Sequence, residues 1–447
     1  MTRRNSAHLI KFAVFSLIGV FLFLVPIPSN ETFTIPVGIL IDLVKSVIHD
    51  YTLWPLTFLV VANALLSLYT AFKKPQWIMD HRWLRETFVT TPLYLISRVV
   101  GAVIIVLYAT QTGPDLITGQ ETGGTMIDLA RSLMSILIVI SYTMPFLTEF
   151  GIMEFVGVLV APVVRPLFLV PGRSAVDLIT SWLGASNAAV LLTKQQYDKG
   201  FYTGREAAII MTNFSLVSIP FCYIVADILQ VTHRFTAFYL ITTAAGILMA
   251  VLISRIPPLR TLSQDYGPGG QRELGEELPP GKGRLAHALD EAARGAEGAT
   301  AQGCLRQGTD MLLSVIFGLS PIIIAWGTAA LLLVEHTEVF NYLSYPLGWY
   351  MNLLGIEGAF EVAPATLVGF ADMFIPPLLL TNVASEATRF IVGSATLLQL
   401  IYMTETGAIM LQSQVPLDFK DLVIIFLERT LLALALVTLL SRVFLSF

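Results

Sequence analysis

Two apolar segments at corresponding places in the chain carry the polar side chains best suited to binding a solute. In the first, Gly184-Ala-Ser-Asn187 is followed by Glu206-Ala207, and in the second, Gly369-Phe-Ala-Asp372 is followed by Glu386-Ala387. Both segments are too short and too interrupted to be ordinary membrane spans. Paired segments of this kind are typical of the binding site of a secondary transporter. Backbone that leaves helical geometry inside a membrane must be buried in protein or line an aqueous cavity.

We predict that Ser186, Asn187 and Asp372 bind the substrate. An ionisable side chain such as Asp372 costs roughly 2.5–3.5 kcal/mol at the centre of a membrane helix, so it normally faces a partner, a cavity or an ion. The structural alternative for Asp372 is that it accepts hydrogen bonds from backbone N–H groups of its own hairpin. Ser186 and Asn187 have a similar alternative, as caps of the first half-helix.

A second set of polar residues is predicted to couple transport to an ion. Thr212, Asn213 and Ser215 place oxygen atoms on one side of the next helix, where they suit a hard cation, although such hydroxyls also bond back to their own helix. Glu405 lies in an apolar span without a nearby basic residue, so it is either a proton carrier or part of a cytoplasm-facing cavity. The expected coupling ion is therefore Na⁺ or H⁺, and we predict no cofactor or bound metal.

Three further acids are expected to have structural roles. Glu206 and Glu386 open helices, where the helix dipole favours a negative charge, and they are predicted to cap them. Asp177 is expected near the end of the first hairpin, at the membrane interface.

The composition is that of a polytopic membrane protein in a lipid bilayer. Of the 447 residues, 55% are hydrophobic and 13% are charged, whereas soluble domains carry about 25% charged residues. The sequence holds no metalloprotease helix, nucleophile elbow or dinucleotide fingerprint, so we predict no enzymatic activity. A nucleic-acid partner is not expected either.

Hydropathy predicts about nine transmembrane helices, at residues 9–27, 53–72, 91–110, 130–149, 207–230, 236–256, 310–334, 387–411 and 421–446. Basic residues gather in alternate loops. By the positive-inside rule, the N-terminus is cytoplasmic and the C-terminus lies outside a bacterial-type inner membrane.

These spans define an all-α fold with two inverted repeats. The first repeat covers 129–256, with a re-entrant hairpin at about 175–203, and the second covers 309–447, with a re-entrant hairpin at about 362–383. Residues 1–128 form an N-terminal membrane scaffold. Residues 257–308 form a cytoplasmic linker, within which Leu285–Ala293 is predicted to be a short amphipathic surface helix.

Several of these motifs resemble known membrane proteins. Gly184–Leu191 and Glu206–Thr212 are similar to the first hairpin of concentrative nucleoside transporters, and Gly369-Phe-Ala-Asp372 resembles their second-hairpin motif Gly-Phe-Ala-Asn. Phe146–Phe155 with Arg165–Asp177 looks like the Gate-domain, or "nucleoside recognition", membrane proteins. That group includes spore-maturation proteins and ferrous-iron permeases. The resemblance covers about residues 130–447.

The resemblance implies ion-coupled secondary transport of a small-molecule solute by elevator-like alternating access, in a homo-oligomer such as a trimer. Ala185 and Asn187 stand where nucleoside transporters read the base, and Asp372 replaces the Asn that holds the ribose. We therefore expect a nucleoside-like or a cationic, amine-bearing solute. One alternative is a non-transporting Gate-domain scaffold or regulatory partner. Another is an inorganic-ion permease, although the sequence lacks intramembrane Cys–His clusters for a soft metal.

Overall fold

The fold is helical almost throughout, as predicted. The computed structural model describes residues 3–25, 27–29, 32–120, 122–175, 177–179, 186–214, 218–270, 283–403, 406–411 and 413–445. Within these described ranges, the exception to the all-α class is one small antiparallel hairpin of β1 (Ile27–Ser29) and β2 (Thr32–Thr34), in which Pro28 lies opposite Phe33. The chain is a multi-pass membrane protein.

Five helical stretches among the described residues are long and apolar enough to cross a membrane. They are Leu53–Lys73, Asp115–Thr148, Thr232–Ile253, Ala301–Leu333 and Phe419–Phe444. Each coincides with one of the predicted spans. Two more predicted spans, at 9–27 and 91–110, coincide with the shorter apolar helices Ala7–Phe23 and Tyr94–Ala109. The total of nine is still a prediction.

The two remaining predicted spans are each broken into two helices, so the expectation of a continuous helix was wrong at both places. The span predicted at 207–230 consists of α13 (Gly204–Asn213) and α14 (Ile219–Ile228). Pro220 in the first turn of α14 lacks a backbone N–H and cannot continue a preceding helix. The span predicted at 387–411 consists of α21 (Glu386–Leu397) and α22 (Thr406–Leu411), and Leu400 between them has a left-handed φ of 60°.

The same order of elements occurs in both predicted repeats. A long apolar helix is followed by a second helix, a hairpin, a broken helix and a final apolar helix. In the first repeat these elements are α8 (Gly123–Thr143), α10 (Ile152–Phe168), the hairpin that ends in α12 (Ser186–Asp198), α13, α14 and α15 (Phe235–Ile253). In the second they are α17 (Ala301–His336), α18 (Val339–Leu353), α19 (Ala359–Val368) with α20 (Ile375–Leu379), α21, α22 and α23 (Phe419–Phe444). The inverted orientation of the repeats stays a prediction.

The chain divides into two compact units. Unit 1 contains Met1–Pro36, Met144–Thr300 and Leu343–Phe447, and unit 2 contains Val37–Thr143 and Ala301–Tyr342. Unit 1 therefore holds α10 to α15 and α19 to α23. The predicted segment boundaries at 128 and 308 follow the sequence repeat and differ from these contact-based units.

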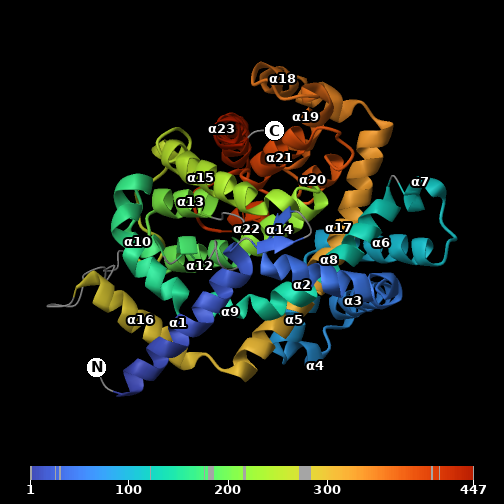
Figure 1. The fold of residues 1–447 in the computed structure, drawn as a ribbon. Helices are drawn as coiled ribbons and strands as arrows, with labels where there is room; N and C mark the ends of the chain where they lie inside the picture. The colour runs from blue at the N-terminus through green and yellow to red at the C-terminus, as the bar shows by residue number, and fades with distance from the viewer. Residues whose placement is uncertain are drawn as a thin grey trace. The chain divides into compact units, whose positions relative to one another are not determined.

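Unit 2 is built from α3 (Leu53–Lys73), α6 (Pro92–Ala109), α8 and α17 (Figure 1). Its core contains buried Leu56, Ile105, Ile127 and Ile324. Hydrogen bonds also join helices of this unit. Trp326 Nε1 donates to Ser97 Oγ at 2.8 Å, and Arg98 Nη1 donates to Ser67 Oγ at 2.7 Å. Helices in lipid associate through close packing and hydrogen bonds of this kind.

The amphipathic helix predicted in the linker is present as α16 (Arg284–Gly298), within unit 1. Its alanine face, which includes buried Ala288 and Ala292, packs against α10 and against α1 (Arg3–Leu24) (Figure 1). Lys11 Nζ donates to the carbonyl of Ala296 at 2.7 Å, which satisfies the last turn of α16. This part of the linker is thus a packed element of unit 1.

Gly101 is a close-packing position in unit 2. A Cβ at this residue would lie 2.3 Å from the backbone oxygen of Pro321 in α17, so we expect Gly101→Ala to destabilise the unit by about 1–3 kcal/mol. Thermal unfolding of the detergent-solubilised protein measures this loss. The control is Gly318→Ala on α17, the helix that carries Pro321. The added Cβ of this variant would have no atom within 4 Å. Equal melting temperatures for the two variants would contradict the proposed close approach.

Candidate functional site

The turn of the second hairpin carries Asp372. It joins α19 to α20, and the Asp372 side chain is 4% exposed. Asp372 Oδ1 accepts a hydrogen bond from the backbone N–H of Phe374 at 2.8 Å, the local turn that Asp favours. Asp372 therefore does accept a hydrogen bond from the backbone of its own hairpin, which was the structural alternative. This hydrogen bond holds the carboxylate at the tip of the hairpin.

This hairpin turn contacts both broken helices and α23, all within unit 1. The ring of Phe374 packs edge-on against Phe221 of α14, with centroids 4.9 Å apart. Phe370 packs against Phe426 of α23 at 5.0 Å, and its carbonyl accepts from the N–H of Met403 at 2.9 Å. Since Met403 lies between α21 and α22, the turn is attached to the second helix break.

The first helix break begins directly after two of the predicted ion-coupling residues. Thr212 and Asn213 are both fully buried at the end of α13. Thr212 Oγ1 donates to Ala208 O at 2.8 Å, and Asn213 Nδ2 donates to Ile209 O at 3.1 Å. These are the bonds to their own helix that we considered as the structural alternative.

Arg429 connects the two helix breaks. It lies near the middle of α23 and is fully buried. Its Nη1 donates to Asn213 Oδ1 at 2.7 Å, and its Nε donates to the carbonyl of Leu398, the residue at the end of α21, at 2.8 Å. Its Nη2 has no hydrogen-bond partner among the described residues.

Gln399, next to Leu398 in the chain, makes a second set of hydrogen bonds at the same helix break. Gln399 Nε2 donates to Thr366 O at 2.7 Å and to Thr430 Oγ1 at 2.9 Å. Gln399 therefore ties the second break to α19 and to α23. A Cβ at Gly369 would lie only 1.9 Å from Gln399 Oε1, so a larger residue there would displace the Gln399 side chain. Gln399 Oε1 itself lacks a hydrogen-bond partner within the described part of the chain.

Sequence analysis missed both Arg429 and Gln399. The available signal was the pair Glu428-Arg429 inside an otherwise apolar predicted span, since an ionisable residue in a membrane span is by default a candidate functional residue. No comparable signal marks Gln399, because its importance depends on the break in the helix.

The other predicted site residues are described only in part or not at all. Ser186 and Asn187 lie in the first turn of α12, which packs against α13 and α22, but their side chains are outside the described residues. Ser215 and Glu405 also fall outside them. The structure thus brings the turn bearing Asp372 together with both helix breaks, and it does not test the roles assigned to Ser186, Asn187, Ser215 or Glu405.

Asp177 anchors the first hairpin from a buried position, and its expected place at the membrane interface stays a prediction. Asp177 is 2% exposed, and its Oδ2 accepts from Tyr202 Oη at 2.8 Å and from Thr193 Oγ1 at 3.5 Å. A buried carboxylate needs such donors, because the apolar interior does not solvate its charge. The two donors come from α12 and from the loop that follows it, which explains why Asp177 is drawn inward.

The two helix-opening glutamates differ in role. Glu206 forms the predicted cap: Thr203 N donates to Glu206 Oε2 at 2.8 Å, and Glu206 N donates to Thr203 Oγ1 at 3.2 Å. At the start of α21 the side chain of Ser385 is the cap instead. Glu386 pairs with Arg234, with 2.7 Å between Oε1 and Nε, and so links the second broken helix to the loop before α15.

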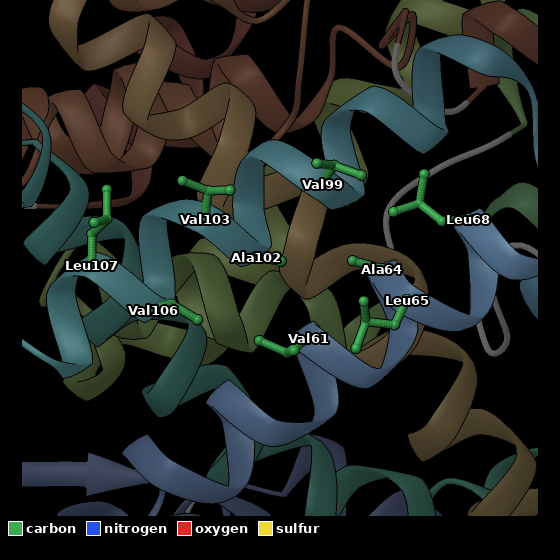
Figure 2. A pocket seen from close by; sticks show the side chains of 9 residues that line it. All are labelled: Val61, Ala64, Leu65, Leu68, Val99, Ala102, Val103, Val106 and Leu107. Carbon is green, nitrogen blue, oxygen red and sulfur yellow. The ribbon is translucent and has the colours of Figure 1, made fainter.

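A separate pocket in unit 2 has the wrong chemistry for a polar solute. It lies between α3 and α6, has a volume of about 290 Å³, and is lined by side chains that are all apolar (Figure 2). Binding sites for polar ligands need a few hydrogen-bonding groups that fix orientation. We therefore place the candidate site in unit 1.

Comparison with known proteins supports a Gate-type protein. Residues 130–232 match the Gate family model, which is described as nucleoside recognition. An uncharacterized protein of Alkalihalophilus pseudofirmus is 39% identical over 446 residues, which cover 99% of this chain and 96% of that protein. A solved structure of a CNTnw double variant in an outward-facing state is similar over 96% of this chain and 98% of that one, with 14% identity and a TM-score of 0.35. That score is too low to equate the two folds.

Removing one hydroxyl tests the anchor of the first hairpin. Tyr202→Phe deletes a hydrogen bond to the buried Asp177 carboxylate, and loss of a bond to a charged group costs about 1.5–3 kcal/mol. We expect a lower melting temperature in detergent. Tyr51→Phe, at a tyrosine that is 78% exposed, should be neutral, and a Tyr202→Phe variant as stable as this control would contradict the anchor.

Proposed function

We propose that this protein, whose residues 130–232 match the Gate family model described as nucleoside recognition, is a secondary transporter of a small polar solute. One observation carries the proposal. Two interrupted helices at corresponding places of a multi-pass membrane protein are joined by one buried set of polar contacts, centred on Arg429. Broken helices that supply polar groups inside the membrane are the usual construction of transporter binding sites.

The backbone at the second break supports this assignment. The carbonyl of Leu398 accepts from Arg429, and the carbonyl of Leu400 accepts from Thr406 Oγ1 at 2.7 Å. Non-helical backbone within a membrane is tolerated where protein or an aqueous cavity satisfies it. Each break removes helical hydrogen bonds and so lowers the stability of the fold. Such a loss is expected at a functional site.

We assign Ser186, Asn187 and Asp372 to substrate binding, as the sequence predicts. Asp372 is the best supported of the three, because its carboxylate is buried and held by the turn that contacts α14, α23 and the second break. Ser186 and Asn187 are proposed from the sequence correspondence with Asp372 and from the contact of α12 with α22.

For the coupling ion, the position of Arg429 favours a proton over sodium. Thr212, Asn213 and Ser215 were predicted to hold a cation, but Asn213 Oδ1 lies 2.7 Å from the guanidinium of Arg429. Two unit positive charges about 4 Å apart repel by about 4 kcal/mol at an effective dielectric constant of 20. We therefore propose that an acid such as Glu405 carries a proton.

Elevator-like alternating access is supported by the contacts within unit 1. The contacts that join the second hairpin, both broken helices and α23 are all internal to this unit. A bundle that holds its own contacts can move as one body. We also propose a homo-oligomer in a bacterial-type inner membrane with a cytoplasmic N-terminus, as expected from the family resemblance and the charge distribution.

Transport by purified protein in proteoliposomes tests the proposal. We would measure uptake of labelled nucleosides, amines, amino acids and small peptides under an imposed sodium or proton gradient. Asp372→Asn keeps an oxygen that can accept from Phe374 N and so should fold, while it removes the charge. We expect gradient-driven uptake of one solute class, reduced at least about tenfold in this variant by loss of a charged contact.

Asp310→Asn is the control, because its side chain is 53% exposed. Absence of uptake by folded wild-type protein under every gradient would favour the scaffold or regulatory alternative. Accumulation of an inorganic ion alone would favour the permease. Uptake that Asp372→Asn leaves unchanged would keep the transporter and contradict the role of Asp372.

A further inference from the structure

Arg429 is a buried charge whose described contacts are all neutral. Its side chain is fully buried, and its two hydrogen-bond acceptors are the amide oxygen of Asn213 and the backbone oxygen of Leu398. Neutral acceptors satisfy N–H groups but do not cancel the charge. No acid among the described residues forms an ion pair with Arg429.

Two described acids, Asp372 and Glu428, lie on elements next to Arg429, and neither forms an ion pair with it. Asp372 Oδ1 accepts from its own hairpin backbone. Glu428 precedes Arg429 in α23, but successive side chains on an α-helix point about 100° apart, and no ion pair joins these two residues. A buried charge without a counter-charge is strongly unfavourable. Among the described residues Arg429 therefore has no counter-charge, and a bound negative group would stabilise it.

The donors that Arg429 has left match an oxyanion. Its Nη2 is buried and without a hydrogen-bond partner among the described residues. A guanidinium is planar and always charged, and its N–H groups match the oxygens of a carboxylate or a phosphate. An isolated cation or a neutral nucleoside base does not supply such a partner.

An acceptor lies in the adjoining contact. Arg429 and Thr430 are consecutive on α23, and they bond to the consecutive residues Leu398 and Gln399 of the second break. Gln399 Oε1, which is buried, also has no hydrogen-bond partner in the described residues. The two adjoining contacts thus leave donors at Arg429 and an acceptor at Gln399.

We propose that the solute of this protein carries an oxyanion, a carboxylate or a phosphate, which binds Arg429 between the two helix breaks, while Gln399 accepts a hydroxyl or amine of the same solute. This inference rests on the proposed function and names the substrate class for it. It also changes the earlier expectation of a nucleoside-like or a cationic, amine-bearing solute. A negative group on the ligand would balance the fixed charge of Arg429.

Ligand-induced stabilisation of the purified protein in detergent tests the binding step without transport. The probes are sodium acetate, glutamate, phosphate and uridine monophosphate, compared with sodium chloride at equal ionic strength and with neutral uridine. A ligand that binds only the folded state raises the melting temperature with its concentration. We expect a rise with one oxyanion class and none with chloride or uridine; acetate and glutamate together indicate a carboxylate, and the two phosphates indicate a phosphate.

Arg429→Gln should weaken this binding roughly 10- to 100-fold, because a hydrogen bond to a charged group is lost. Arg442→Gln is the matched control on the same helix. Arg442 donates to Leu354 O at 2.7 Å and is exposed at the end of α23, so its removal should leave the oxyanion effect unchanged. Gln399→Leu should weaken binding of glutamate but not of acetate, which has no donor for Gln399.

Asn213→Asp tests the same idea if Arg429→Gln does not fold. It keeps the shape of Asn213 and places a carboxylate 2.7 Å from the guanidinium. We expect a higher melting temperature without ligand and loss of the stabilisation by oxyanions, since the introduced carboxylate neutralises the charge of Arg429. An oxyanion effect that survives in both Asn213→Asp and Arg429→Gln would overturn the assignment.

The results separate this inference from the proposed function. Arg429-dependent binding of an oxyanion by a protein that transports nothing in proteoliposomes would support the site and contradict transport. Gradient-driven uptake of uridine that Arg429→Gln retains would support transport and overturn the oxyanion site. Stabilisation of folded wild type by uridine alone, or by none of the probes, would also overturn it.

Discussion

In apolar surroundings a helix that stops leaves backbone N–H and C=O groups that only the protein itself can satisfy. The chain interrupts two helices in this way, after Asn213 and after Leu397. At the second interruption, side chains donate to the carbonyls that have no helical partner: Arg429 donates to Leu398 O and Thr406 donates to Leu400 O. Asn213 at the first interruption accepts from the same Arg429. The two broken helices are thereby tied to α23 and to each other.

This requirement concentrates polarity in one part of the molecule. Within unit 1, α23 supplies Arg429 and Thr430 to two neighbouring contacts, and the turn bearing Asp372 packs against the same elements. Unit 2 combines close approach at small residues such as Gly101 with hydrogen bonds between helices, such as those of Trp326 and Arg98. Its described pocket is accordingly apolar, and the polar chemistry expected of a transporter is found among the contacts of unit 1.

Local signals in the sequence predicted a large part of the fold. The acidic Glu206 at a helix start indicated a capped helix, the pattern of Leu285–Ala293 indicated α16, and the Gly-Phe-Ala-Asp motif indicated the second hairpin turn. Hydropathy did not find the helix breaks, because residues on both sides of each break are apolar and an averaged window passes over a few non-helical positions. The burial of Asp177 was not predicted either, because it depends on the hydroxyl of Tyr202, 25 residues away.

The sequence by itself determined the membrane class, the Gate-type family and the places of the paired polar segments, because composition, capping and short motifs act over a few neighbouring residues. Only the tertiary structure decided which polar groups meet. Arg429 reaches an acceptor 216 residues away in Asn213 and another 31 residues away in Leu398. Whether a buried guanidinium faces an acid, an amide or a carbonyl depends on how distant helices pack, and that packing brings two neutral acceptors to its charge.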